Sequence, residues 1–241
     1  MSGFLAENLM RFLEGALMTV QLSALSCALG FMIAVPVALA RLSSDRAQFS
    51  LATAYVFFFR GTPLLAQIFL IYYGSGQFRP ELDALGLWAF FRDPWFCAVL
   101  ALSLNNGAYT SEILRGSIAA VPIGEVEAAR ALGLKAWMRL WLVILPRAIR
   151  IGWSAYSNQV VYQIQATSLV SVITMMDITG VARSIGARDF TFYEAFGLAA
   201  VLYIVLIYCT ILVSRRIERH LNAYLGASPA PSPPFGTDVV P

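Results

Sequence analysis

Charged side chains are scarce in this sequence, and their scarcity excludes an ordinary water-soluble domain. Asp, Glu, Lys and Arg make up 13% of the 241 residues, while 59% of the residues are hydrophobic. Soluble globular domains carry about 25% charged residues. The composition therefore predicts an integral membrane protein.

Residue types that support catalysis or cofactor binding are also few. His220 is the only histidine and lies among arginines, where a solvated residue is expected. Cys27, Cys97 and Cys209 fall within apolar segments without metal-ligand spacing, so we expect small buried side chains. The sequence contains no GxxxxGK[ST] loop for ATP and no basic stripe for nucleic acid. We predict no catalytic residue, no metal site and no cofactor in this chain, and no nucleic-acid partner.

Long uncharged runs are abundant, and each can supply about 20 residues, the length of a transmembrane helix. The five runs are Ala16 to Ala40, Gly61 to Phe78, Pro94 to Ser111, Ile151 to Met176 and Ala195 to Ser214. Only Arg60 separates the second run from the uncharged residues before it, so we expect that crossing from about Ser50 to Gly74. The first run follows Glu7, Arg11 and Glu14, which is unlike a cleaved signal peptide. We predict an all-α membrane protein with five transmembrane helices.

The basic residues segregate between alternate loops. Eleven of the 17 fall on one side, five on the other, and Arg60 lies within a span. The positive-inside rule then places the N-terminus outside and the C-terminus inside. We expect a periplasmic segment over residues 1–14, a transmembrane domain over residues 15–224 and a disordered cytoplasmic tail over residues 225–241. Five helices cannot form two equal inverted halves, so the pathway is expected to need a second subunit.

The predicted cytoplasmic loop, residues 115–150, has its own helical pattern. Pro122 and Gly124 are expected to break the preceding helix, after which a short helix runs to Gly133. A second helical stretch, from Ala136 to Ile144, places Trp137 and Trp141 on one face, and Pro146 is expected to close it. Periodicity permits either an interfacial helix with a tryptophan belt or a helix that docks into a groove of a cytoplasmic partner.

The same loop carries a sequence motif. Glu127-Ala128-Ala129, Gly133 and Val143-Ile144-Leu145-Pro146 follow one another at the spacings of the EAA loop, which this segment resembles. That loop is typical of bacterial ABC importer permeases, and Val143 stands where the pattern has Ile. The resemblance implies a coupling helix that docks into an ATP-binding subunit. The residues expected to couple are Gly124, Glu127, Ala128, Ala129, Gly133, Leu145 and Pro146.

Two further segments resemble the polar amino-acid permeases, Phe59 to Leu65 (FRGTPLL) and Leu104 to Glu112 (LNNGAYTSE). Ser154 to Leu169 and Asp177 to Arg183 are similar to the histidine, lysine, arginine, ornithine and opine branch. The resemblance covers Gly15 to Tyr224 and implies a MetI-like, type I ABC importer permease of the bacterial inner membrane. The implied partners are two ATP-binding subunits that hold ATP and Mg, a second and different permease chain, a periplasmic substrate-binding protein and membrane lipid. The implied substrate is an amino acid, basic in this branch.

A polar stripe marks the fourth span. Ser154, Asn158, Tyr162 and Gln165 recur at helical spacing, and Thr167 and Ser168 follow. Such groups cannot face lipid unpaired, so the stripe must face protein or a watery cavity. Hydrogen bonding between subunits and a substrate pathway both remain open. Related permeases carry a Lys and an acid where this chain has Gln165 and Ala166, so a cationic substrate would be repelled less.

The third span adds four pathway candidates, Asn105, Asn106, Tyr109 and Glu112. Glu112 can attract a cation, or it can pair with Arg115 one turn further on. Arg60, beside Gly61 and Pro63, is expected at a structural kink. A membrane adaptor that recruits a partner through the same loop is the alternative to a transporter, and so is a stand-alone channel. An adaptor has no need of a polar stripe.

Overall fold

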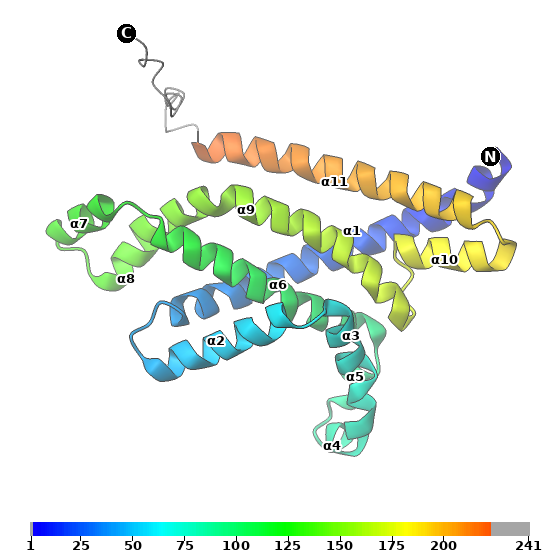
Figure 1. Ribbon diagram of the computed structural model, residues 1–241, viewed down its shortest axis with the longest axis horizontal. Coiled ribbons are helices and arrows are strands. Elements are labelled where there is room, and N and C mark those ends of the chain that lie inside the picture. Colours follow the sequence, from blue (N-terminus) through cyan, green and yellow to red (C-terminus); the bar gives the residue numbers. More distant parts are fainter. Residues whose placement is uncertain (1, 223–241) are drawn as a thin grey trace, which may run out of the picture.

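The computed structural model describes residues 2–222, with side chains from residue 7, and every regular element in this part is helical. The helices form an elongated bundle (Figure 1). The tail predicted to be disordered, residues 225–241, lies outside the described residues.

Helix α6 (Pro94–Ala119) is the central element. It begins where the Asp93 carboxylate accepts a hydrogen bond from the Trp95 N–H (3.1 Å) and Pro94 occupies the first turn. Fourteen of its residues are buried. It packs against α1 (Ser2–Ala40), α2 (Arg46–Gly61), α3 (Leu64–Tyr72) and α9 (Leu145–Ala166). Gly107 permits the close approach of α2 to α6, because a Cβ there would lie 2.9 Å from the Tyr55 hydroxyl.

Two long helices flank the centre. Helix α1 continues through residue 14 without a break, so no helix boundary marks the end of the predicted periplasmic segment. Helix α11 (Phe192–Asn222) buries only Ala195 and Ala199, and it packs against α10 (Ile178–Asp189) and α9. Leu198, Leu202, Tyr203 and Leu206 also pack against this part of the core, while other apolar side chains such as Ile204 and Val205 are exposed.

The run from Ser50 to Gly74, expected as one crossing, consists of two helices separated by a bend. Helix α2 and the helical segment Leu64–Ala84, which begins with α3, are bent by 104° at Thr62 and Pro63. Pro63 cannot donate a backbone hydrogen bond, and the Gln67 amide instead donates to the carbonyls of Phe59 (2.9 Å) and Thr62 (3.1 Å). The chain then turns away from the bundle through η1 (Gly74–Phe78), α4 (Arg79–Ala84) and α5 (Trp88–Phe91) (Figure 1).

The fourth apolar run also changes geometry before it ends. Helix α9 passes into the 3₁₀-helix η3 (Thr167–Ile173), and Thr174 has a left-handed backbone (φ 69°). Helix α10 follows after a bend of 45°. Its first turn is capped by the buried Asp177, which accepts hydrogen bonds from the N–H groups of Gly180 (2.9 Å) and Thr179 (3.2 Å).

The helical knob predicted within residues 115–150 is present at one end of the molecule (Figure 1). It contains α7 (Ile123–Ala131), α8 (Ala136–Arg139) and the π-helix η2 (Leu140–Ile144), which leads directly into α9. Pro146 therefore does not close the helix, which corrects that expectation. In the wide π turn, Leu145 N–H bonds to the Leu140 carbonyl, so the proline that follows lies in the first turn of α9.

Length and apolar character alone support fewer crossings than the five predicted. Among the described helices, residues 7–40 and 192–222 qualify as single spans, and each of the two bent pairs can add one. Helix α6 does not qualify by itself. Because protein surrounds it, its outer surface does not need to be apolar, and its buried asparagines lower its hydropathy. The five crossings and their orientation stay predictions.

Candidate functional site

The knob at the end of the bundle presents apolar side chains to the outside. Ile123, Leu132, Trp137 and Trp141 are all exposed, Leu132 at 80% of its surface. Gly133 ends the first helix with a left-handed backbone (φ 75°), as its place in the motif predicts. Large apolar side chains exposed around a fixed turn are typical of a docking surface.

The predicted coupling residues are all part of this knob or of its junction with α9. Gly124, Glu127, Ala128, Gly133 and Pro146 are exposed, whereas Ala129 and Leu145 are buried, and Leu145 packs with Ala38 and Leu114 of the bundle. The Arg147 guanidinium lies 3.2 Å from the Glu125 carboxylate, so α9 is tied to α7. Arg139 donates a hydrogen bond to the Leu134 carbonyl (2.8 Å), which fixes the turn after Gly133.

The polar stripe of α9 lies on the surface of the subunit. Ser154, Asn158, Tyr162 and Gln165 are exposed. Thr167 is buried and Ser168 half-buried, and their hydroxyls bond to backbone carbonyls of the preceding turn. A polar face of this kind on a membrane helix requires another polar surface or water opposite it.

Asn105 and Asn106 do not join that surface, because α6 turns them into the interior. Asn106 donates to the Gln163 carbonyl oxygen (3.2 Å), and Gln163 donates to the Ser26 hydroxyl (2.8 Å). Asn105 donates to the Phe59 carbonyl (3.0 Å) and to Gln67 (3.1 Å) at the α2–α3 bend. Both asparagines therefore have a structural role, because their hydrogen bonds hold α6 against α9 and against the α2–α3 bend. Gln67 was missed as a partner because it lies in an unremarkable apolar segment.

Tyr109 and Glu112 lie at the border between the interior and the polar surface. The Tyr109 ring is 6.1 Å from the Tyr162 ring of the stripe, and the Arg60 guanidinium lies 5.1 Å over it. Arg60 lies in the last turn of α2, directly before the bend, so its expected place at a kink is confirmed.

Glu112 is enclosed by arginines. The expected pair with Arg115 is present (3.0 Å), Arg41 lies at 3.2 Å and Arg60 at 3.9 Å. The contact with Arg41 was missed, because nothing in the sequence brings the end of α1 to α6. With three guanidinium groups around it, this carboxylate is not free to attract a cationic ligand.

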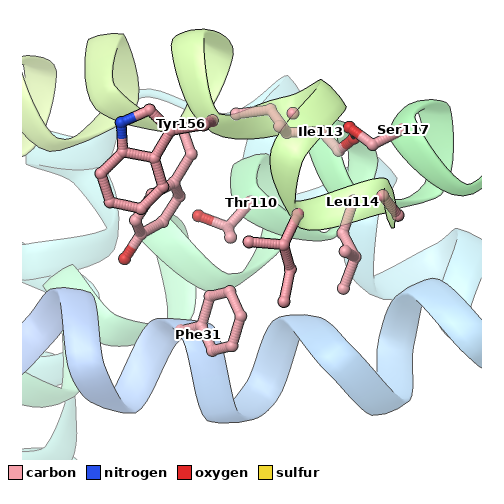
Figure 2. A pocket seen from close by; sticks show the side chains of 10 residues that line it. Phe31, Thr110, Ile113, Leu114, Ser117 and Tyr156 are labelled. Atoms are coloured by element: carbon pink, nitrogen blue, oxygen red, sulfur yellow. Dashed lines mark hydrogen bonds between the residues drawn. The ribbon is translucent and has the colours of Figure 1, made fainter. Parts of the chain in front are cut away.

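Figure 2 shows an apolar cavity of about 260 Å³ where α1, α6 and α9 meet beside the knob. Its walls include Phe31, Ile113 and Tyr156. Two of the three hydroxyl-bearing residues on its wall bond within the protein, Thr110 to Asn106 (3.2 Å) and Ser117 to the Ile113 carbonyl (2.7 Å), and Tyr156 is the third. The cavity therefore offers a mainly apolar surface to an occupant.

A helical membrane bundle with a polar outer face and a protruding apolar knob defines a membrane transport component that works with partner subunits. The family model described as "binding-protein-dependent transport system inner membrane component" matches residues 26–223. The chain belongs to this family. It is a multi-pass permease subunit of the inner membrane rather than a catalytic subunit.

Relatives cover nearly the whole chain. The nopaline transport system permease protein NocM of Agrobacterium fabrum is 45% identical over 224 residues, 92% of each chain. The histidine/lysine/arginine/ornithine transport system permease protein HisM of Escherichia coli is 40% identical over 206 residues, 85% of this chain and 86% of HisM.

Solved structures agree with the fold. A crystal structure of an amino acid ABC transporter with histidines matches with a TM-score of 0.79 and 31% identity, over 90% of this chain and 96% of the other. An inward-facing MetNI methionine ABC transporter matches with a TM-score of 0.75 over 89% of this chain and 98% of the other. At 17% identity, the second match concerns the fold alone.

Proposed function

We propose that this chain is the pore-forming permease subunit of an ATP-driven importer for basic amino acids or opines. Two ATP-binding subunits, a second permease chain and a periplasmic binding protein complete the proposed transporter. The exposed polar stripe of α9 is the observation that carries this proposal, since a membrane helix keeps such a face only beside water or protein. A membrane adaptor would have no use for it.

The stripe is proposed to line a pathway between two permease chains. It lies on the outside of the subunit, so one chain supplies only one wall. The second wall is assigned to a homologous but different chain, since sister permeases are implied by the branch that this sequence resembles. The N-terminus is proposed to lie outside and the C-terminus inside, with five crossings.

Substrate contact is assigned to uncharged polar side chains. Glu112 is already held by three arginines, and Asn105 and Asn106 are bonded inside the subunit. Ser154, Asn158, Tyr162 and Gln165 remain as accessible hydrogen-bonding groups. The relatives named above serve nopaline and histidine/lysine/arginine/ornithine transport systems, which supports a basic substrate or an opine.

The knob is proposed to transmit the movement of the ATP-binding subunits. Its exposed apolar side chains suit a groove on such a subunit, and Gly133 sets its turn. Helix α9 continues from the knob into the stripe, and the Arg147–Glu125 pair links the two. Closure of the ATP-binding subunits would then rock α6 and α9 as rigid bodies between outward-facing and inward-facing states.

Uptake of radiolabelled arginine by vesicles that contain the assembled transporter, with and without ATP, tests the proposal. Alanine and glutamate serve as control substrates. ATP-dependent uptake of arginine alone supports both the importer and the basic substrate. Uptake of a control amino acid overturns the substrate class only. Assembly with the ATP-binding subunits but no ATP-dependent uptake of any basic amino acid or opine would overturn the transporter in favour of the adaptor.

A further inference from the structure

A second apolar hollow lies on the opposite side of α9 from the polar stripe. It is a groove of about 390 Å³ between α9 and α11, lined by Trp153, Tyr156, Val160, Leu206, Val213 and Ile217 among others. Helices α9 and α11 lie side by side along it (Figure 1). In a membrane, this groove faces the lipid unless another protein covers it.

Three polar groups on the groove wall are engaged within the protein. The Trp153 indole N–H donates to the Ser214 carbonyl (3.0 Å), which also ties α9 to α11. The hydroxyls of Ser157 and Thr210 bond to carbonyls of their own helices, both at 2.8 Å. Most of the remaining lining is apolar, so a hydrocarbon chain fits the chemistry of the groove.

Positive charge stands at one end of the groove. Arg150 lies two turns before the groove residue Ser157 on α9, and Arg216 lies two turns after the groove residue Cys209 on α11. Because residues two turns apart share a face of a helix, each arginine lies on the side of its helix that lines the groove. The first turns of α9 and the last turns of α11, which contain these arginines, lie at the end of the bundle that carries the knob (Figure 1). The ion pairs found within residues 7–222 include neither of them.

We propose that the α9–α11 groove binds an anionic phospholipid of the surrounding membrane. An acyl chain lies along Val160 and Leu206, and the phosphate group is bound by Arg150 and Arg216. The cavity of Figure 2 is lined by the same Trp153 and Tyr156 rings, so it lies beside the groove. We assign the lipid's other acyl chain to this cavity. Charge complementarity selects an anionic headgroup over a zwitterionic one.

Trp153 supplies a direct readout, because bromine atoms on a lipid tail quench a nearby indole. The assembled transporter is placed in nanodiscs of phosphatidylcholine, with increasing fractions of brominated phosphatidylglycerol or of brominated phosphatidylcholine. Subtracting the signal of Trp153→Phe isolates the contribution of Trp153. We expect half-maximal quenching at about a tenfold lower mole fraction of the anionic lipid, because each arginine favours an anionic headgroup.

Matched charge variants decide the headgroup assignment. Arg150→Gln/Arg216→Gln is expected to abolish the preference for phosphatidylglycerol. Arg46→Gln/Arg215→Gln removes the same charge from exposed arginines, one at the start of α2 and one on the face of α11 opposite the groove-lining residues, and is expected to keep the preference. Equal quenching by both lipids, or an equal loss in both double variants, would overturn the proposal. Absence of Trp153 quenching by either lipid would show that protein covers the groove and would overturn it as well.

Discussion

The guanidinium of Arg41, beyond the last turn of α1, lies 3.2 Å from the carboxylate of Glu112 in the middle of α6. The same carboxylate receives two hydrogen bonds from the Arg115 Nε (3.1 and 3.2 Å) and one from its Nη2 (3.0 Å). One acidic side chain thus holds together α1, the end of α2 and α6. Its side chain is only 16% exposed, so water screens these contacts weakly.

Glu112→Gln should therefore destabilise the subunit. Removing the charge leaves Arg41, Arg60 and Arg115 close together without a counter-charge, at a cost of about 1–3 kcal/mol in the free energy of unfolding. The measurement is the thermal unfolding midpoint of the purified transporter, which should fall by several degrees. Asp83→Asn is the control, because Asp83 forms an exposed pair with Arg79 (3.7 Å) worth about 0.5 kcal/mol or less. Equal midpoints for the two variants would contradict the central role of Glu112.

Two glutamines on α9 should separate stability from transport. Gln163→Leu leaves the Asn106 amide and the Ser26 hydroxyl without their partner, so the unfolding free energy should fall by about 1–2 kcal/mol. Gln165→Leu alters an exposed side chain and should leave the unfolding midpoint unchanged. In the proposed transporter, Gln165→Leu should still lower ATP-dependent uptake. Wild-type uptake by this variant would argue against the stripe as a pathway wall.

The bend between α2 and α3 should depend on Gln67 more than on Pro63. Gln67 donates to the carbonyls of Phe59 and Thr62 and to the Thr62 hydroxyl (2.8 Å), so it satisfies carbonyls that the bend leaves without helical partners. Gln67→Leu should lower the unfolding free energy by about 1–3 kcal/mol. Pro63→Ala should cost less, because those hydrogen bonds remain. The exposed Gln77→Leu is the matched control, and a larger loss for Pro63→Ala than for Gln67→Leu would refute this order.

Gly133→Val should weaken coupling through the backbone alone. No atom lies within 4 Å of a Cβ built at Gly133, but its φ of +75° costs a β-branched residue about 1–2 kcal/mol. The turn should shift, and both retention of the ATP-binding subunits during purification and ATP-dependent uptake should fall. Gly197→Val is the control, since Gly197 also has open space around it but lies within α11. Gly133→Asn should restore much of the loss, because asparagine tolerates the left-handed region.

Two prolines show that a local sequence pattern does not by itself determine whether a helix bends or continues. Pro63 stands at a bend of 104°, while Pro146 lies in the first turn of a continuous helix. The residue type is the same in both places. The difference comes from the surroundings, since Gln67 and Asn105 stabilise the open carbonyls beside Pro63 and a π turn makes room before Pro146.

The sequence by itself determined the features that depend on short-range order. It predicted the apolar runs that become α1, α9 and α11, the end of a short helix at Gly133 and the Glu112–Arg115 pair one helical turn apart. Only the tertiary structure decided which side chains of a polar helix face inward. Gln163 is buried and Gln165 exposed because α1 and α6 cover one side of α9, and Arg41 reaches Glu112 only because α1 crosses α6. Such contacts join residues far apart in the chain, and their formation depends on which helix faces pack together rather than on any local pattern.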